Sequence, residues 1–259
     1  MDLLTNMLWV EWRKATRSRM VLWTILASLL MPLGIAFLIF VAKNPAFSEK
    51  LGLISAKANL VAYAGTDWPA YMGWFGQVIG AGGFILTAFT MTWVFGREFS
   101  DGTLKDLLAV PIERTSIVLA KIILVAAWSV LMAGVIFAAG LVMGLFLRLP
   151  GATAFAIFQG GVTVALTTCL VIPLVMPFAF FASLGRGYLL SIALAALALM
   201  LTNLSNVLGR GDYFPWAIPL IFAQGKTPLG PVSYGIVLVT GLAGIMVTDW
   251  WWKHADQTR

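Results

Sequence analysis

Residues 96–121 have the sequence GREFSDGTLKDLLAVPIERTSIVLAK, and this stretch decides the fold. Eight of its 26 residues are charged, although long apolar runs almost free of charge lie on both sides. The whole chain is 60% hydrophobic and only 11% charged, with a mean hydropathy of +0.92. This composition excludes an ordinary soluble domain, and charged side chains avoid the hydrocarbon core of a bilayer. The stretch is therefore predicted to lie outside the membrane, between two membrane-spanning helices.

Six windows of the chain are long and apolar enough to cross a bilayer, which takes about 20 residues of helix. They are residues 21–41, 74–95, 122–147, 160–184, 188–208 and 232–252. No lysine, arginine, glutamate or histidine lies inside the first five windows, and Asp249 lies near the end of the sixth. We therefore expect an all-α polytopic membrane protein, with residues 1–259 forming a single transmembrane domain. The residues before the first window include Asp2 and Glu11, which is not typical of a cleaved signal peptide.

The distribution of basic residues predicts the orientation. With both termini inside, eleven of the 17 lysines and arginines fall on inner segments and the other six on outer segments. Cytoplasmic loops carry such an excess. We expect a multi-pass protein of a prokaryotic cell membrane, with both termini and the 96–121 stretch on the cytoplasmic side. Its basic residues are expected to meet membrane lipid and not nucleic acid.

Residues 1–20 are predicted to form an amphipathic helix on the inner membrane surface. Leu4, Leu8 and Trp12 recur at helical spacing, whereas Arg13 is polar. Apolar side chains over acyl chains and arginines near headgroups suit an interfacial helix. The alternative is a basic flank that only fixes the orientation.

Two segments of irregular backbone are predicted. Pro173 and Pro177 each remove a backbone hydrogen bond from the fourth span, so a kink or break is expected there. They form either a hinge or a pair of prolines that the membrane helix tolerates without function. Residues 209–231 combine charges, prolines and an apolar middle too short to cross, and form either a re-entrant or interfacial hairpin or an ordinary loop.

Two pairs of glycines at Gly-x-x-x-Gly spacing predict places where helices approach closely. They are Gly76 with Gly80 and Gly140 with Gly144. Small residues at this spacing pack helices within one chain or between subunits, and we expect packing within the chain.

The residue types that the spans lack disfavour several kinds of function. Ion-coupled transporters need ionisable side chains at depth, and an intramembrane serine protease needs a base beside its serine. One cysteine, Cys169, and one histidine, His254, leave no set of metal ligands, so no metal site is expected. The Gly-Lys-Thr sequence at 225–227 lacks the earlier glycine of a P-loop, which is Leu220 here. ATP binding by this chain is therefore not expected.

A short capped helix is predicted within the 96–121 stretch. Thr103 precedes Asp106 at the spacing of a capping box, with Ser100 or Asp101 as alternative caps. Three leucines share one face of such a helix, and a proline ends it: Leu104, Leu107, Leu108 and Pro111. This helix is suited to fit a groove on a partner, although a loop that only closes the hairpin has the same pattern.

The stretch resembles the motif of type 2 ATP-binding-cassette (ABC) permeases. That motif has Phe-x-x-Glu, then Gly-Thr and leucines, then Pro-x-x-Arg and a later lysine. The matching positions are Phe95, Glu98, Gly102, Thr103, Leu104, Leu107, Leu108, Pro111, Arg114 and Lys121. The N-terminal helix, the six spans and the irregular segment before the last span resemble the family too. The sequence Tyr-Phe-Pro-Trp at 213–216 is similar, more weakly, to permeases related to bacitracin resistance and lantibiotic immunity.

The resemblance implies that the loop between spans two and three holds a coupling helix that docks on a separate ATPase subunit. The residues it assigns to ATPase coupling are Arg97, Glu98, Gly102, Thr103, Leu104, Leu107, Leu108, Pro111 and Arg114. Of these, Arg97 and Glu98 are expected at the joint between the loop and the second span. Two permeases, identical or homologous, would pair around the substrate. ATP and magnesium would bind to the partner ATPase, and this chain would hold no cofactor.

The leading hypothesis is therefore the permease subunit of an ABC exporter, a transport subunit without an ATPase site of its own. The apolar spans suggest a hydrophobic or amphipathic cargo such as a peptide, lipid or drug. The alternative is a non-transporting polytopic protein that anchors or assembles a larger complex. Co-expression with an ATPase separates the two hypotheses.

Overall fold

The computed structural model describes residues 3–44, 67–109, 112–225 and 228–254, and these residues form helices joined by short turns. The elements are α1 (Leu3–Thr16), α2 (Met20–Lys43), α5 (Trp68–Val78), η1 (Ile79–Gly83), α6 (Phe84–Ser100), α7 (Leu104–Ala109), α8 (Arg114–Phe146), α9 (Ala154–Leu184), α10 (Leu189–Val207), η2 (Gly211–Tyr213), η3 (Pro215–Ala217), α11 (Ile218–Gln224) and α12 (Pro231–His254). Six helical segments, with α5, η1 and α6 counted as one, are long and apolar enough to cross a membrane. The predicted all-α class with six spans is confirmed. Pro111 and the side chain of Leu108 lie outside the described residues.

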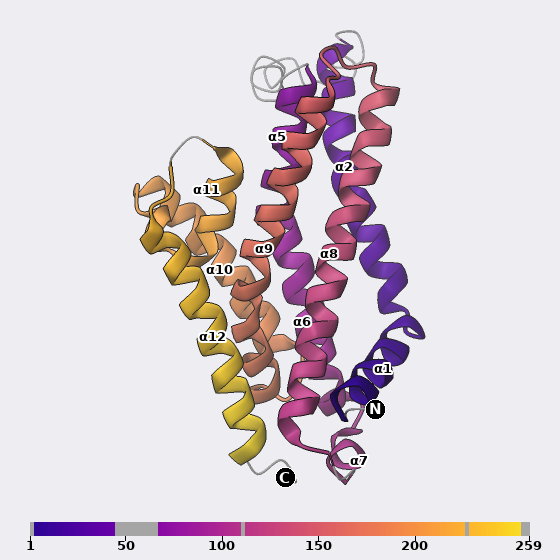
Figure 1. Cartoon of the computed structure of the whole chain (residues 1–259), viewed down its shortest axis with the longest axis vertical. Coiled ribbons are helices and arrows are strands. Elements are labelled where there is room, and N and C mark those ends of the chain that lie inside the picture. Colours follow the sequence, from indigo (N-terminus) through magenta and orange to yellow (C-terminus); the bar gives the residue numbers. More distant parts are fainter. Residues whose placement is uncertain (1–2, 45–66, 110–111, 226–227, 255–259) are drawn as a thin grey trace.

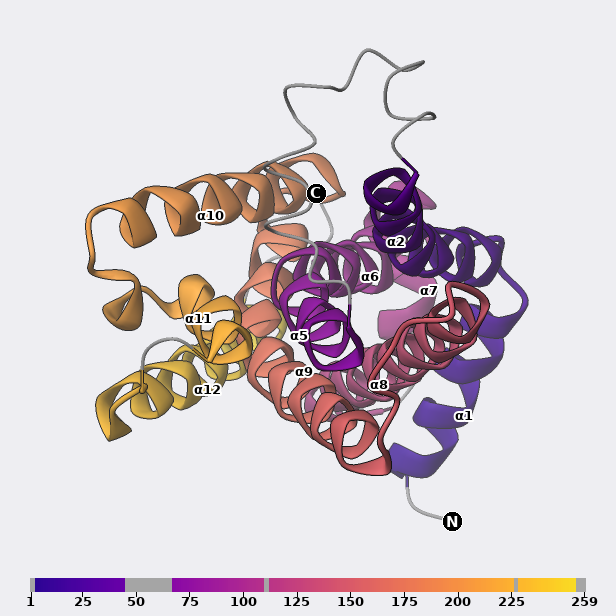
Figure 2. The same ribbon diagram turned by 90° about the horizontal axis from the view of Figure 1, so that it is seen from above.

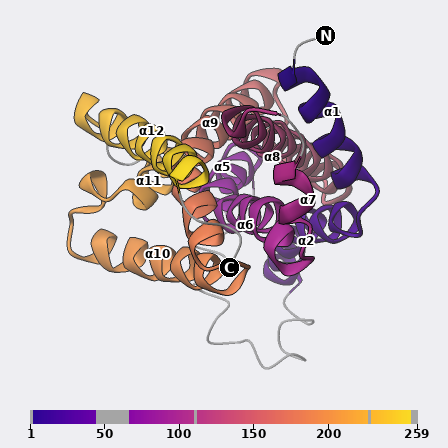
Figure 3. The ribbon, with the colours of Figure 1, turned by 90° about the horizontal axis from the view of Figure 1, so that it is seen from below.

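The spans form an upright bundle with a smaller group of helices at its side. Helices α2, α5, α6, α8 and α9 run side by side, and α10, α11 and α12 flank them (Figures 1 and 2). Helix α1 lies obliquely across one end of the bundle, and α7 lies at the same end (Figures 1 and 3). The last turn of α12 is also at this end, so the first and the last described helices share one side of the bundle with α7.

Three spans are longer than the sequence windows predicted. They are Trp68–Ser100, Arg114–Phe146 and Ala154–Leu184. Arg97, Glu98 and Lys121 consequently lie inside spanning helices. All three charges lie outside the charge-free windows at 74–95 and 122–147, and they neutralise one another within the protein.

The short helix α11 packs against a π-helical turn in the second span. A Cβ atom on Gly80 of this turn, η1, would lie 3.0 Å from the Cα of Leu220, and one on Gly76 would lie 3.1 Å from the Cβ of Ala223. Gly80 is twelve residues from Trp68, or about 18 Å along the helix axis at 1.5 Å per residue. In the described part of the 209–231 segment, α11 thus packs into the bundle, which favours the predicted re-entrant arrangement over an ordinary surface loop.

The second glycine pair also packs within the chain. A Cβ atom on Gly140 would overlap the ring of Phe75, and one on Gly144 would lie 2.8 Å from the rings of Trp68 and Tyr71. The hydroxyl of Tyr71 donates to the Gly140 carbonyl at 2.8 Å. Both pairs therefore allow helices of one chain to approach, as the sequence predicted.

The two prolines of α9 lie where α12 crosses it. Helix α9 continues from Ala154 to Leu184 through Pro173 and Pro177, so it is not broken there. A Cβ atom on Gly241 of α12 would lie 2.6 Å from the Cβ of Pro173, and one on Gly244 would lie 2.5 Å from the nitrogen of Pro177. The prolines therefore form a close packing surface for α12, and a hinge at them remains a prediction.

Candidate functional site

A tight turn and one short helix join α6 to α8. The amide of Asp101, after the end of α6, still donates to the carbonyl of Arg97 at 2.8 Å. Gly102 follows with φ of +70°, in the left-handed region where a Cβ atom causes strain. The Leu107 amide then donates to the Thr103 carbonyl at 3.1 Å. Gly102 therefore sets the direction in which α7 leaves the span.

Some side chains of α7 are buried in the protein core, and others are exposed on its surface. Leu104 is 5% exposed and belongs to the main hydrophobic core, and Leu107 packs against the same core. Lys105 and Asp106 are exposed. The leucine side of the helix thus faces the protein itself, at least for Leu104 and Leu107. A partner that approaches α7 meets Lys105 and Asp106 first.

Thr103 connects α7 to the end of α6. Its hydroxyl donates to Oε2 of Glu98 at 2.7 Å. Among the described residues the Thr103 oxygen accepts no hydrogen bond from the Asp106 amide, so the predicted capping box is not formed. The bond that Thr103 donates to the charged carboxylate is stronger than one between neutral groups.

Glu98 also forms a buried ion pair with Lys121 of α8. The Lys121 ammonium lies 2.9 Å from Oε1 of Glu98 and donates to the Val94 carbonyl at 3.1 Å. A third bond, of 3.1 Å, runs to Oε2 of Glu11 in α1. Lys121 is 0% exposed. A buried ammonium is tolerated only when acceptors surround it, and these three bonds supply them.

Two further cations complete a group that we name the ionic cluster. It consists of Glu11, Lys14, Arg97, Glu98 and Lys121. The Lys14 ammonium lies 3.1 Å from Glu98 and 3.3 Å from Glu11. Arg97 lies 3.7 Å from Glu98 and 4.0 Å from Glu11, with its guanidinium 4.5 Å from the ring centre of Trp93. Two carboxylates therefore face three cations.

The ionic cluster ties three helices together. Its members come from α1, α6 and α8, and the two carboxylates and Lys121 are buried. Removal of one partner from a buried pair typically costs about 3–5 kcal/mol, because the other charge is left without compensation. The three helices are therefore held as one unit directly beside α7.

Arg114 makes a different contact from the other predicted coupling residues. It begins α8, and its Nη1 donates to the carbonyls of Trp252 at 2.7 Å and Lys253 at 3.2 Å. These carbonyls belong to the end of α12, where backbone acceptors lack helical partners and attract a cation. Arg114 thus links the end of the 96–121 stretch to the last span.

Glu11 and Lys14 were not predicted as site residues, and Lys121 was predicted only as part of the motif. Met7, Glu11 and Ala15 recur every four residues and are buried on one side of α1, which packs against α8. A carboxylate in the middle of an apolar helix face predicts a buried cation opposite it. That pattern was the available signal. The tryptophans Trp9 and Trp12 are exposed on α1, and the contact of this helix with the membrane surface remains a prediction.

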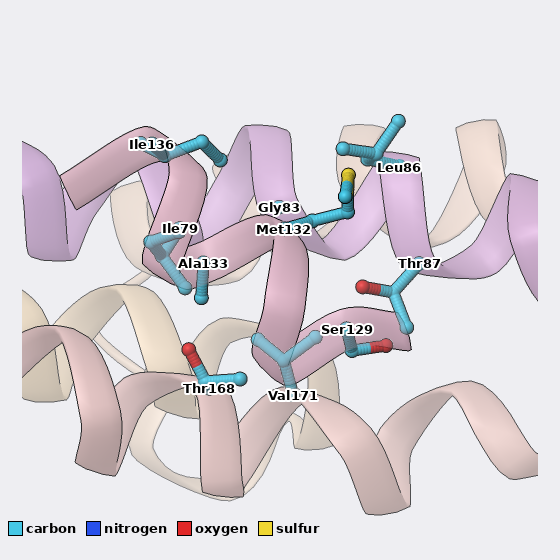
Figure 4. Close-up of a pocket in the computed structure, with 10 residues that line it drawn as sticks. All are labelled: Ile79, Gly83, Leu86, Thr87, Ser129, Met132, Ala133, Ile136, Thr168 and Val171. Atoms are coloured by element: carbon cyan, nitrogen blue, oxygen red, sulfur yellow. The ribbon is translucent and has the colours of Figure 1, made fainter. Parts of the chain in front are cut away.

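A small cavity lies beside η1, between α6, α8 and α9 (Figure 4). Its volume of ≈ 10 Å³ gives room for about one water molecule. The hydroxyl side chains of Thr87, Ser129 and Thr168 lie around it among apolar groups. This cavity is too small for a transported molecule. Within the described ranges, no three His, Cys, Asp or Glu side chains gather as metal ligands would.

Comparison with known proteins agrees with this architecture. Residues 7–202, from α1 into α10, match the family described as ABC-2 family transporter protein. Over 168 residues the chain is 25% identical to the bacitracin transport permease protein BCRB of Bacillus licheniformis. The matched region covers 64% of this chain and 81% of BCRB. With a family match over well more than half its length, this chain is a membrane permease that belongs to the ABC-2 family of transporter proteins.

Proposed function

We propose that this chain is the membrane subunit of an ATP-driven exporter and that a separate ATPase docks on α7. The observation that carries the proposal is the direct connection from α7 through Thr103 to Glu98 and Lys121. Lys105 and Asp106 are exposed on α7, which lies at the same end of the molecule as α1 and the last turn of α12 (Figures 1 and 3). The excess of lysine and arginine on this side supports its assignment to the cytoplasm.

The ionic cluster is suited to carry a movement of α7 into the membrane. A displaced α7 acts on Glu98 through the 2.7 Å bond from Thr103. Glu98 in turn is held to α8 by Lys121 and to α1 by Lys14. An ATPase that closes on ATP would therefore shift three helices together and bias a two-state arrangement of the bundle. ATP and magnesium would stay on the ATPase.

A second permease, identical or homologous, would complete the path for the cargo. Helix α10 supports this proposal because Leu189, Met200 and Val207 are 84%, 70% and 84% exposed. Apolar helix surfaces of this kind contact lipid or another membrane chain. The cavity beside η1 has room for about one water, which favours a path between two chains over one through a single chain.

The relative's name suggests the class of cargo. BCRB is described as a bacitracin transport permease, and the match to it extends over 81% of its length. The apolar spans of this chain are compatible with a hydrophobic or amphipathic molecule, which includes peptides, lipids and drugs. We propose cargo of this class.

Charge reversal on α7 tests the docking surface. The chain is co-expressed with an ABC ATPase encoded beside it, as wild type and as the Lys105→Glu/Asp106→Lys variant. These side chains are exposed, so the fold should survive and the co-purified ATPase should fall at least about tenfold, which corresponds to 1.4 kcal/mol. Arg210→Glu, an exposed change at the other end of the bundle, should leave association unchanged.

Two results would oppose the proposal. Full association of the α7 variant would exclude this docking surface. A wild-type chain that binds no ATPase would favour the non-transporting anchor. Leu104→Asp is a poorer test, because Leu104 is part of the core and its replacement also destabilises the fold.

A further inference from the structure

An apolar groove of ≈ 340 Å³ runs along the contact between α9 and α12, outside the ionic cluster and α7. All the lining residues that the structure describes come from these two helices, among them Cys169, Pro173, Tyr234, Leu238 and Leu242. The lining is dominated by hydrocarbon side chains. The groove opens sideways from the bundle and is not enclosed.

The packing of α12 on α9 explains why a groove exists there. At Gly241 the helices approach so closely that a Cβ atom would lie 2.6 Å from Pro173. On one side of this contact, Leu174, Ile218 and Val237 form a small hydrophobic cluster, with Ile218 supplied by α11 (Figure 2). Val237 also lines the groove, and Leu238 and Leu242, which are 60% and 51% exposed, form the more exposed part of its wall on α12.

The length of the groove matches one leaflet of a bilayer. Its α12 lining extends from Tyr234 to Ile245, eleven residues or about 16 Å along the helix. Half of a hydrocarbon core of about 30 Å is about 15 Å. Tyr234 lies three residues after the start of α12 at Pro231, and tyrosines mark the membrane interface. The groove therefore runs from one interface to the middle of the bilayer.

We propose that this groove is a binding site for a single hydrocarbon chain of a membrane lipid, from the leaflet at the N-terminal end of α12. The lining offers apolar contact and little hydrogen bonding, so a chain binds and a headgroup does not. The volume lies near the lower limit of about 300–1,000 Å³ for small-molecule sites, which suits one chain and not a whole lipid. The site does not depend on ATPase docking or transport.

Photoactivatable lipids test this site. The full chain is reconstituted in phosphatidylcholine vesicles that contain a phosphatidylcholine with a diazirine at a chosen chain carbon. We expect adducts on both groove walls, near Tyr234 when the diazirine is close to the glycerol and near Ile245 when it is close to the chain end. Unlabelled phosphatidylcholine should compete, and labelling should saturate.

Two matched variants give the control. Leu238→Trp/Leu242→Trp fills the groove and should lower the adducts at Cys169 and Ile172 at least about tenfold, a loss of 1.4 kcal/mol. Val239→Trp adds the same side chain on α12, at a position that is 64% exposed and outside the lining, and should leave these adducts unchanged.

A measurement on the wild type guards against a variant that misfolds. Cys169 is the only cysteine, is exposed and lines the groove, so bound lipid should slow its reaction with a maleimide as phosphatidylcholine is added to protein in detergent. Non-saturable adducts spread evenly around α12, or no protection of Cys169, would overturn the proposal. Cross-links from the groove to a second copy would overturn it as well, since the groove would then be a subunit contact.

Discussion

The ammonium of Lys121 lies 2.9 Å from Oε1 of Glu98, and both side chains are buried where α6 meets α8. Thr103, the residue just before the short helix α7, donates a hydrogen bond to Glu98 of this pair. A charged pair at this place is costly to bury and costly to break. The surface helix and the membrane helices are therefore connected by a rigid polar contact instead of a flexible loop.

Glu98→Gln should destabilise the chain as well as impair transport. Lys121 would keep Glu11 and the Val94 carbonyl, so we expect a loss near the lower end of the range for broken buried pairs, about 3 kcal/mol. Denaturant unfolding of the purified chain measures this loss in the free energy of unfolding.

Two further variants serve as controls. Glu98→Gln/Lys121→Met removes both charges and should regain part of the stability. Lys253→Gln breaks the exposed pair with Asp249 and should change the free energy of unfolding by less than about 1 kcal/mol. Equal stability of the Glu98 variant and wild type would show that the pair is not structural.

Glu11→Gln should loosen α1 from the bundle. The change removes the charge that binds Lys121 to α1, while the apolar contacts of Met7 and Ala15 remain. Local opening should become more frequent, and deuterium exchange at the amides of α1 should rise about tenfold. Arg13→Gln, an exposed change on the same helix, is the control and should leave exchange as in wild type. Equal exchange in both variants would show that the Glu11 carboxylate does not hold α1 on the bundle.

Gly244→Ala should separate α12 from α9. Its Cβ would lie 2.5 Å from the nitrogen of Pro177, a backbone atom that cannot rotate away, so overpacking should cost about 1–3 kcal/mol. Gly235→Ala is the matched control on the same helix, with no atom within 4 Å of the new Cβ. It should be neutral or stabilising by up to about 1 kcal/mol, because alanine is the better helix former. Thermal unfolding in detergent compares them, and a stable Gly244 variant would contradict the close packing.

Gly102→Ala should weaken ATPase association without affecting membrane insertion. A Cβ atom there meets no other atom within 4 Å, but φ of +70° strains an alanine by about 1–2 kcal/mol. The turn should relax and move α7. Gly102→Asn should have a smaller effect, because asparagine tolerates this conformation better. If co-purification with the ATPase is the same in alanine, asparagine and wild-type chains, the direction of α7 is not important for docking.

The sequence was sufficient for the class of fold and the position of the charged stretch. Charge-free windows identified six spans because the bilayer excludes unpaired charge, whatever the helices pack against. The same windows did not give the ends of the helices. Lys121 lies just before the window at 122–147, and its pairing with Glu98 and Glu11 allows the helix to begin earlier, at Arg114.

The contacts of the site could not be predicted from spacing along the chain. Thr103 and Asp106 have the spacing of a capping box, but the hydroxyl of Thr103 instead donates to a carboxylate of the preceding helix. Glu11 is 110 residues from Lys121, and only the packing of α1 on α8 brings them together. Leu104 forms an apolar face with its neighbours as predicted, yet the core of the same chain covers it.

Site-specific photo-crosslinking tests most directly whether α7 contacts the ATPase. A photoreactive amino acid replaces Lys105 or Asp106, or Arg210 at the other end of the bundle, in cells that express the chain with its ATPase. All three positions are exposed, so each should tolerate the substitution. The account predicts an adduct with the ATPase at positions 105 and 106 and none at position 210. No adduct at 105 or 106, although the two proteins co-purify, would contradict it.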